Sequence, residues 1–228
     1  MPKVAIRRLS FPIGFVLLIW IIHIMQAYLG ISLIRLGVFP GAIDGLPGIL
    51  TSPLIHGSWD HLFYNSLSFL ILGAIIFWFY PKIALRSFVW LYLLSGLGVW
   101  IFAQPNSFHI GASGLVYGMV SLVFWNGVFR RNLKSTVLAL IILVLYAGYF
   151  GGIVPGKEGI SWESHLLGAI AGIGLAWWYK NEIEEDEIPE PPMEEEEEKE
   201  YFLSRDAFEL TLAERTRIEN EKRNNPLL

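Results

Sequence analysis

Six apolar stretches recur along the first 181 residues, and each approaches the length needed to cross a membrane. About 20 apolar residues in an α-helix span the hydrocarbon layer, because each residue advances the helix by about 1.5 Å. The sequence therefore predicts an all-α, polytopic membrane protein with a bundle of six transmembrane helices. The stretches run from Phe11 to Leu29, His61 to Tyr80, Phe88 to Phe102, Ser113 to Phe129, Leu133 to Phe150 and His165 to Tyr179.

Charged residues divide the chain into a membrane body and a soluble tail. Residues 1–181 hold 11 Lys and Arg against 4 Asp and Glu, whereas residues 182–228 hold 6 against 17. The body has too few charges to cover a water-facing surface, and the tail has too few apolar residues to build a core. We predict a membrane domain at 1–181, an acidic, Pro-containing disordered linker at 182–200 and a charged cytoplasmic tail at 201–228. That tail could form a helix, and nothing in its pattern identifies a partner.

The Lys and Arg residues between the stretches predict the orientation. Nine of them fall on one side of the membrane, against only Arg35 and Lys157 on the other. The positive-inside rule then places both termini in the cytoplasm, for a multi-pass protein of the plasma (inner) membrane. The first stretch could instead be a cleaved signal peptide, but no small-residue cleavage site follows it.

Composition excludes several other kinds of site. The chain has no Cys, which rules out disulfides, Cys-ligated zinc, iron–sulfur clusters and thiol nucleophiles. Its net charge is −4 and it lacks basic stripes, which argues against nucleic acid as a partner.

Polar side chains gather at the outer ends of the second, fourth and sixth stretches. His61 and Asn65 lie one helical turn apart, Ser113 opens the fourth stretch, and His165 opens the sixth. All three stretches run inward from the same side, so these residues are expected at one depth. Polar groups within a membrane are costly, which favours a functional role for them.

Pairs of glycines explain how these residues could meet. Each pair, spaced four apart on the fourth or sixth stretch, removes side-chain bulk and lets two helices approach. Ser113 and His165 are then expected within hydrogen-bond reach, as a base and a serine nucleophile require. His61, Asn65 and the backbone N–H of Ser113 could stabilise the resulting oxyanion. No carboxylate is obviously placed to orient His165, so a two-residue dyad is favoured over a triad.

At these residues the sequence resembles the rhomboid family of intramembrane serine proteases. The ordered set of motifs, together with the six stretches that carry them, covers residues 11 to 180, whereas any one motif alone would be weak. The chain departs from many family members in having no Trp-Arg pair between residues 30 and 60. The matching pieces are His56-x4-His61-x3-Asn65, Gly111-Ala112-Ser113-Gly114 with Tyr117 and Gly118, and His165-x2-Gly168-x3-Gly172.

The resemblance implies a rhomboid-like fold and a specific reaction. Ser113 would be the nucleophile, His165 the general base and acid, and His61 and Asn65 part of the oxyanion hole. The implied substrates are single-span or other membrane proteins in the lipid bilayer, cut in or near a transmembrane segment with no cofactor and no metal. The residues implied to support the site are His56, Tyr117, Gly111, Gly114, Gly118, Gly168 and Gly172.

Other interpretations remain open at this point. The chain could be a catalytically silent rhomboid-like protein that binds transmembrane helices, or a small transporter, although polarity confined to the outer ends argues against a transporter. Glu163 could orient His165, but its position two residues earlier puts it on another helical face. His109 is interpreted as a solvated loop residue. A metal site built from His56, His61, His109 and His165 matches no known helical zinc motif.

Overall fold

The computed structural model describes residues 2–156, 161–188 and 210–224. The chain divides into two compact units, Met1–Ile188 and Pro189–Leu228. Within the described residues the secondary structure is helical, with one isolated β-bridge between Val38 and His109. The all-α prediction is confirmed for this part of the chain.

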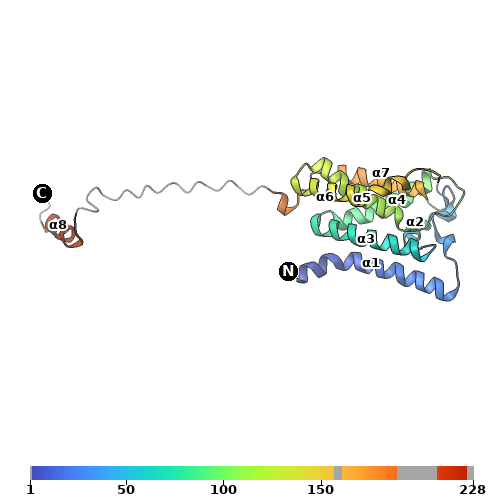
Figure 1. Cartoon of the computed structure of the whole chain (residues 1–228), viewed down its shortest axis with the longest axis horizontal. Helices are drawn as coiled ribbons and strands as arrows, with labels where there is room; N and C mark the ends of the chain where they lie inside the picture. Colours follow the sequence, from blue (N-terminus) through green and yellow to red (C-terminus); the bar gives the residue numbers. More distant parts are fainter. Residues whose placement is uncertain (1, 157–160, 189–209, 225–228) are drawn as a thin grey trace. The chain divides into compact units, whose positions relative to one another are not determined.

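Among the described residues of the first unit there are six longer helices (Figure 1), and each overlaps one of the six apolar stretches, although the ends differ. Residues 30–58 between the first two form only short turns, namely η1 (Ile34–Leu36), η2 (Ile43–Gly45), α2 (Gly48–Thr51) and η3 (Ser52–Leu54). In the second unit the described residues include α8 (Leu212–Asn224). The six longer helices are α1 (Pro2–Leu29), α3 (Trp59–Phe79), α4 (Ala84–Phe102), α5 (Ser113–Arg130), α6 (Leu133–Leu145) and α7 (Trp162–Trp178).

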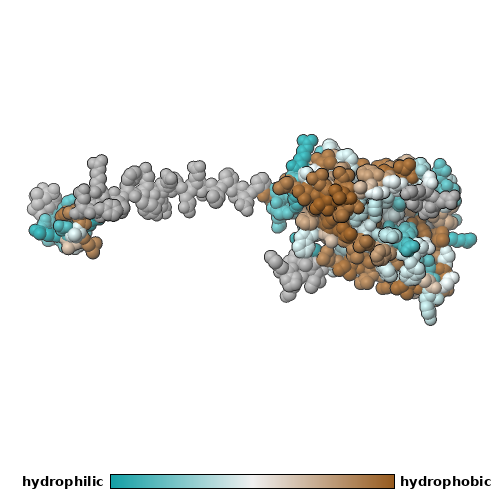
Figure 2. Space-filling model, in the orientation of Figure 1, coloured by the Kyte–Doolittle hydropathy of each residue, from teal (hydrophilic) through white to brown (hydrophobic). Residues whose placement is uncertain are grey.

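Three of these helices are long and apolar enough to cross a membrane: Arg8–Leu29 of α1, Trp59–Phe79 of α3 and Ala84–Phe102 of α4. The shorter α6 is also apolar, and its Leu133 and Val144 side chains are 81% and 77% exposed. Figure 2 shows hydrophobic side chains gathered on the surface over this helix. Large apolar side chains at such exposure are expected where a helix faces lipid.

α5 is the central helix of the first unit. It packs against α3, α4, α6 and α7, while α1 packs on α3. Eleven of its residues are buried, including Leu115 and Leu122. This burial on several faces holds the N-terminus of α5, which carries Ser113, at a fixed place among its neighbours.

The structure differs from the sequence prediction at the end of α6. The helix stops at Leu145, and the remaining predicted residues form the η4 turn (Ala147–Gly152). Three glycines in this turn disfavour a continuous α-helix. The change of direction also turns the carbonyl of Gly152 toward His165.

A second difference concerns residues 182–188, which were predicted as the start of a disordered linker. They fold back on the helix ends, and Glu185–Glu187 form the 3-10 turn η5. Arg130 and Glu187 form a buried ion pair of 2.8 Å, which compensates both charges and holds the segment. The linker residues 189–200, and residues 201–209 and 225–228 of the predicted tail, lie outside the described residues.

Candidate active site

The loop before α5 delivers Ser113 to the site. Gly111 in this loop has a φ of 101°, a conformation that side-chain-bearing residues rarely adopt. A Cβ at this position would lie 2.5 Å from the Cε1 atom of His61. Glycine therefore allows the chain to pass directly against His61 and to begin α5 at Ser113.

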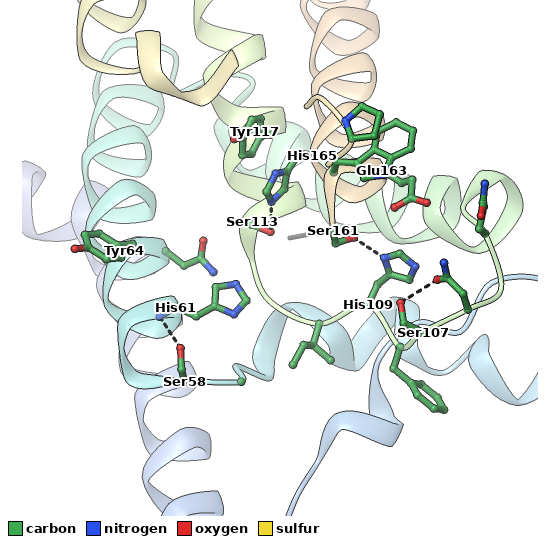
Figure 3. Close-up of a pocket in the computed structure, with 18 of the residues that line it drawn as sticks. Ser58, His61, Tyr64, Ser107, His109, Ser113, Tyr117, Ser161, Glu163 and His165 are labelled. Carbon is green, nitrogen blue, oxygen red and sulfur yellow. Dashed lines mark hydrogen bonds between the residues drawn. The ribbon is translucent and has the colours of Figure 1, made fainter. Parts of the chain in front are cut away.

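Small residues bring α7 against α5. A Cβ on Gly168 would lie 2.0 Å from the carbonyl oxygen of Gly114, and one on Gly172 would lie 2.3 Å from that of Gly118. The two backbones are in direct contact at these points, as small-residue pairs permit. His165 lies one turn before Gly168, and its Nε2 atom is 2.8 Å from the Oγ atom of Ser113 (Figure 3).

The hydrogen-bond partner of His165 Nδ1 shows which ring nitrogen carries the proton. Nδ1 lies 2.9 Å from the carbonyl oxygen of Gly152. A carbonyl only accepts hydrogen bonds, so Nδ1 carries the proton in the neutral ring and Nε2 accepts from the Ser113 hydroxyl. Because both ring nitrogens are engaged, Glu163 does not orient this imidazole. A backbone carbonyl occupies the place that a carboxylate fills in a triad.

An aromatic ring further restricts His165. The rings of Tyr117 and His165 are stacked, with centroids 4.1 Å apart and planes 9° from parallel. Tyr117 in turn donates a hydrogen bond of 2.9 Å to the carbonyl of Tyr149. The imidazole is therefore held at both nitrogens and on one face.

Polar side chains of α3 face the cavity that contains Ser113 and His165. His61 and Asn65 line a cavity of about 1220 Å³ together with Ser113, Tyr117 and His165. Asn65 is 6% exposed, and its Nδ2 atom has no hydrogen-bond partner among the described residues. An amide N–H buried at this position is available to a ligand atom in the cavity.

His56 supports the loop from the other side. Its Nε2 atom accepts a hydrogen bond of 3.5 Å from the backbone N–H of Ala112, and its ring packs 5.0 Å from that of His61. His56 is 1% exposed, so it acts from beneath the cavity surface. Within the described ranges, no group of three or more His, Cys, Asp or Glu could hold a metal ion.

Sequence reasoning misplaced one residue and missed others. His109, interpreted as solvated, is 5% exposed and hydrogen-bonds Ser161. Burial lowers its pKa, and the charge of Glu163 acts in the opposite direction. Gly152 and Tyr149, which hold His165 and Tyr117, were also missed. They contribute backbone carbonyls, and no residue type marks such a role in a sequence.

The arrangement defines a class of protein: a helical membrane protein in which a serine and a histidine from two helices meet in a polar cavity. The family model described as Rhomboid domain matches residues 45–182. The chain belongs to the rhomboid family, and it is an integral membrane protein.

Relatives extend this comparison. An uncharacterised protein of Mycobacterium tuberculosis is 34% identical over 175 residues, which cover 72% of this chain and 71% of the relative. An uncharacterised protein of Mycobacterium leprae is 29% identical, covering 75% and 73%. The protein named Rhomboid-like protein 11, chloroplastic, of Arabidopsis thaliana is 27% identical, covering 56% and 50%.

Proposed function

We propose that this chain is an intramembrane serine endopeptidase that hydrolyses peptide bonds in or near transmembrane segments of other membrane proteins. The observation that carries the proposal is the 2.8 Å contact between Ser113 Oγ and His165 Nε2, with Nδ1 held by a carbonyl. This geometry gives the serine a proton acceptor in the correct tautomer. Membership of the rhomboid family supports the same assignment.

The reaction proceeds in two halves through an acyl-enzyme. As Ser113 Oγ attacks the scissile carbonyl carbon, His165 Nε2 takes its proton. The oxyanion that forms accepts hydrogen bonds from Asn65, His61 and the Ser113 backbone N–H. The C–N bond then breaks, and His165 gives its proton to the leaving amine. Water next attacks the ester while His165 takes a water proton, and that proton returns to Ser113 as the acid leaves.

The proposal includes a membrane arrangement. Six spans, α1 and α3 to α7, place both termini in the cytoplasm, with residues 201–228 as a soluble tail. The contacts of Lys82, Arg86 and Lys134 with residues 182–187 support one positively charged side at which the chain leaves α7. The plasma membrane is the proposed location, and the substrates are single-span or other membrane proteins. The proposed chemistry uses protein groups and water without a cofactor.

Replacing either dyad residue tests the enzyme assignment. In Ser113→Ala and His165→Ala, cleavage of a single-span substrate in proteoliposomes should fall by at least about 10⁴-fold, because nucleophile or base is lost. Gel-based assays of product formation measure this rate. Membrane insertion should be unchanged in both variants, and Ser113→Ala should keep a melting temperature near that of the unaltered protein. His165→Ala should melt somewhat lower, because it also loses the stack on Tyr117 and the bond to Gly152.

A Ser113→Ala protein that still cleaves at the original rate would refute the assignment. Labelling with a fluorophosphonate, which reacts with activated serines, separates this enzyme from a catalytically silent helix-binding protein. An enzyme is labelled at Ser113 and loses the label in His165→Ala. A silent protein binds the substrate segment without being labelled.

A further inference from the structure

His109 joins two loops that flank the cavity. Its backbone N–H donates to the carbonyl of Val38 at 2.8 Å, and its carbonyl accepts from the N–H of Val38 at 2.9 Å. This isolated β-bridge ties the loop of residues 103–112 to that of residues 30–58. The loop that leads into Ser113 is thereby anchored on one side.

The side chain of His109 reaches a third segment, the start of α7. Its Nδ1 atom lies 2.5 Å from Ser161 Oγ (Figure 3). The Ser161 hydroxyl donates to Ser164 Oγ at 2.7 Å, so the Ser161 oxygen accepts and His109 Nδ1 carries the proton. The carbonyl of Ser161 in turn accepts from the backbone N–H of His165 at 3.3 Å.

The spacing of these pairs connects them to the dyad. His109 lies four residues before Ser113, and Ser161 lies four residues before His165. The His109–Ser161 hydrogen bond therefore joins the two chain segments just ahead of the two reacting groups. On the other side of the dyad, the same segments are joined by the contact of Gly114 with Gly168.

We propose that His109 is a positioning residue whose hydrogen bond to Ser161 holds the start of α7, so that His165 Nε2 stays within reach of Ser113 Oγ. This inference rests on the proposed proteolytic function. A misplacement of about 1 Å between reacting groups can cost about 10²-fold in rate. Loss of the His109–Ser161 bond should therefore lower kcat and the reactivity of Ser113, whereas the binding of substrate should change little.

The two ring nitrogens of His109 can be tested separately. His109→Asn places an amide N–H near the position of Nδ1, whereas His109→Gln places its amide near that of Nε2. In proteoliposomes with a single-span substrate, kcat should fall about 10- to 100-fold in His109→Ala and His109→Gln, with KM changed less than about twofold. His109→Asn should recover most of the loss. Fluorophosphonate labelling of Ser113, normalised to folded protein, should follow the same order.

Controls separate positioning from general loss of structure. Ser107→Ala alters the same loop, but among the described residues its hydroxyl bonds only the neighbouring Asn106, so kcat should not change. Ser161→Ala should lower kcat at least as much as His109→Ala, because it removes the same bond and also the one to Ser164. The double variant should be no slower than Ser161→Ala, because the His109–Ser161 bond can be lost only once. Equal rates for His109→Asn and His109→Gln, additive losses in the double variant, or an unchanged kcat in His109→Ala would overturn the inference. The proposed function fails on separate outcomes: cleavage by Ser113→Ala at the original rate, or an unaltered protein that neither cleaves the substrate nor is labelled at Ser113.

Discussion

Asn65 has a buried side-chain amide whose hydrogen-bond donor, Nδ2, is unpaired among the described residues. Leaving a buried donor unpaired typically costs about 1–3 kcal/mol, so a folded chain retains such a group at some expense. A negative charge that develops on a substrate oxygen in the cavity would supply the missing acceptor.

Asn65→Leu and the near-isosteric Asn65→Asp should each lower kcat by about 10²- to 10³-fold, because a donor to the oxyanion is lost. KM should change little, since the bond strengthens only in the transition state. Steady-state kinetics with a single-span substrate measure both quantities. Tyr64→Phe is the matched control, because Tyr64 neighbours Asn65 on α3 and lines the same cavity. Wild-type kcat in Asn65→Leu would remove this residue from the oxyanion site.

At the level of elements, the contact between α5 and α7 decides whether the site exists. Ser113 and His165 belong to different helices and are 52 residues apart in sequence. Their helices touch through backbone atoms at Gly114 and Gly168. Added bulk there would separate the helices and lengthen the distance between hydroxyl and imidazole.

Gly168→Ala should destabilise the protein by about 1–3 kcal/mol and slow cleavage, because its Cβ would clash with a backbone carbonyl that cannot move aside. Gly174→Ala on the same helix is the matched control, since no atom lies within 4 Å of a Cβ there. The control should be neutral or slightly stabilising, because Ala favours helix over Gly. Thermal unfolding in detergent micelles compares the two. Equal melting temperatures would show that the α5–α7 contact tolerates a methyl group.

At the level of the whole first unit, residues 182–188 tie the end of α7 to other helices. Glu187 pairs with Arg130 at the end of α5 and with Lys134 on α6. Glu184, which is 2% exposed, accepts from the backbone N–H of Lys82 before α4. The segment therefore closes the bundle at the end opposite the cavity.

Glu187→Gln should lower the free energy of unfolding by about 3–5 kcal/mol, because it takes from the buried Arg130 the carboxylate that it pairs with. The matched control is Glu182→Gln. Glu182 pairs with Arg86 at the surface, with side chains 40% and 50% exposed, so the loss should be at most about 1 kcal/mol. Denaturation in micelles at neutral pH measures both. Equal effects of the two changes would contradict a buried role for Glu187.

The stability of the protein at acidic pH provides a second test of the Arg130–Glu187 ion pair. Burial alone would raise the pKa of Glu187, but the Glu184 N–H and the charges of Arg130 and Lys134 outweigh it and hold the pKa below 4.5. A lowered pKa in the folded state contributes stability above pH 4.5 that is lost as pH falls through the folded value. In Glu187→Gln, the free energy of unfolding should therefore fall less steeply as the pH drops below 4.5. Burial raises the pKa of Glu184, so this residue changes the pH dependence of the free energy of unfolding in the opposite direction.

The sequence supported several specific predictions because their signals are local. Apolar runs of helical length marked the helices, and Gly168 and Gly172 marked a face that can approach another backbone. Ser113, His165, His61 and Asn65 stood out because polar groups are rare in such runs. His109 gave no comparable signal, since a histidine in a loop is usually solvated. The structure buries it because a distant loop and the start of α7 both pack against it.

The sequence by itself therefore determined the all-helical membrane body and its family, since the lengths of apolar runs and the order of motifs are properties of the chain alone. Tertiary structure decided which partners complete the site. Three contacts of this kind are the bond from His165 to the Gly152 carbonyl, the bond from His109 to Ser161, and the packing of residues 182–188 on basic helix ends. They join segments that lie 13, 52 and up to 102 residues apart in sequence. Each depends on backbone direction and distance after packing, and residue identity encodes neither.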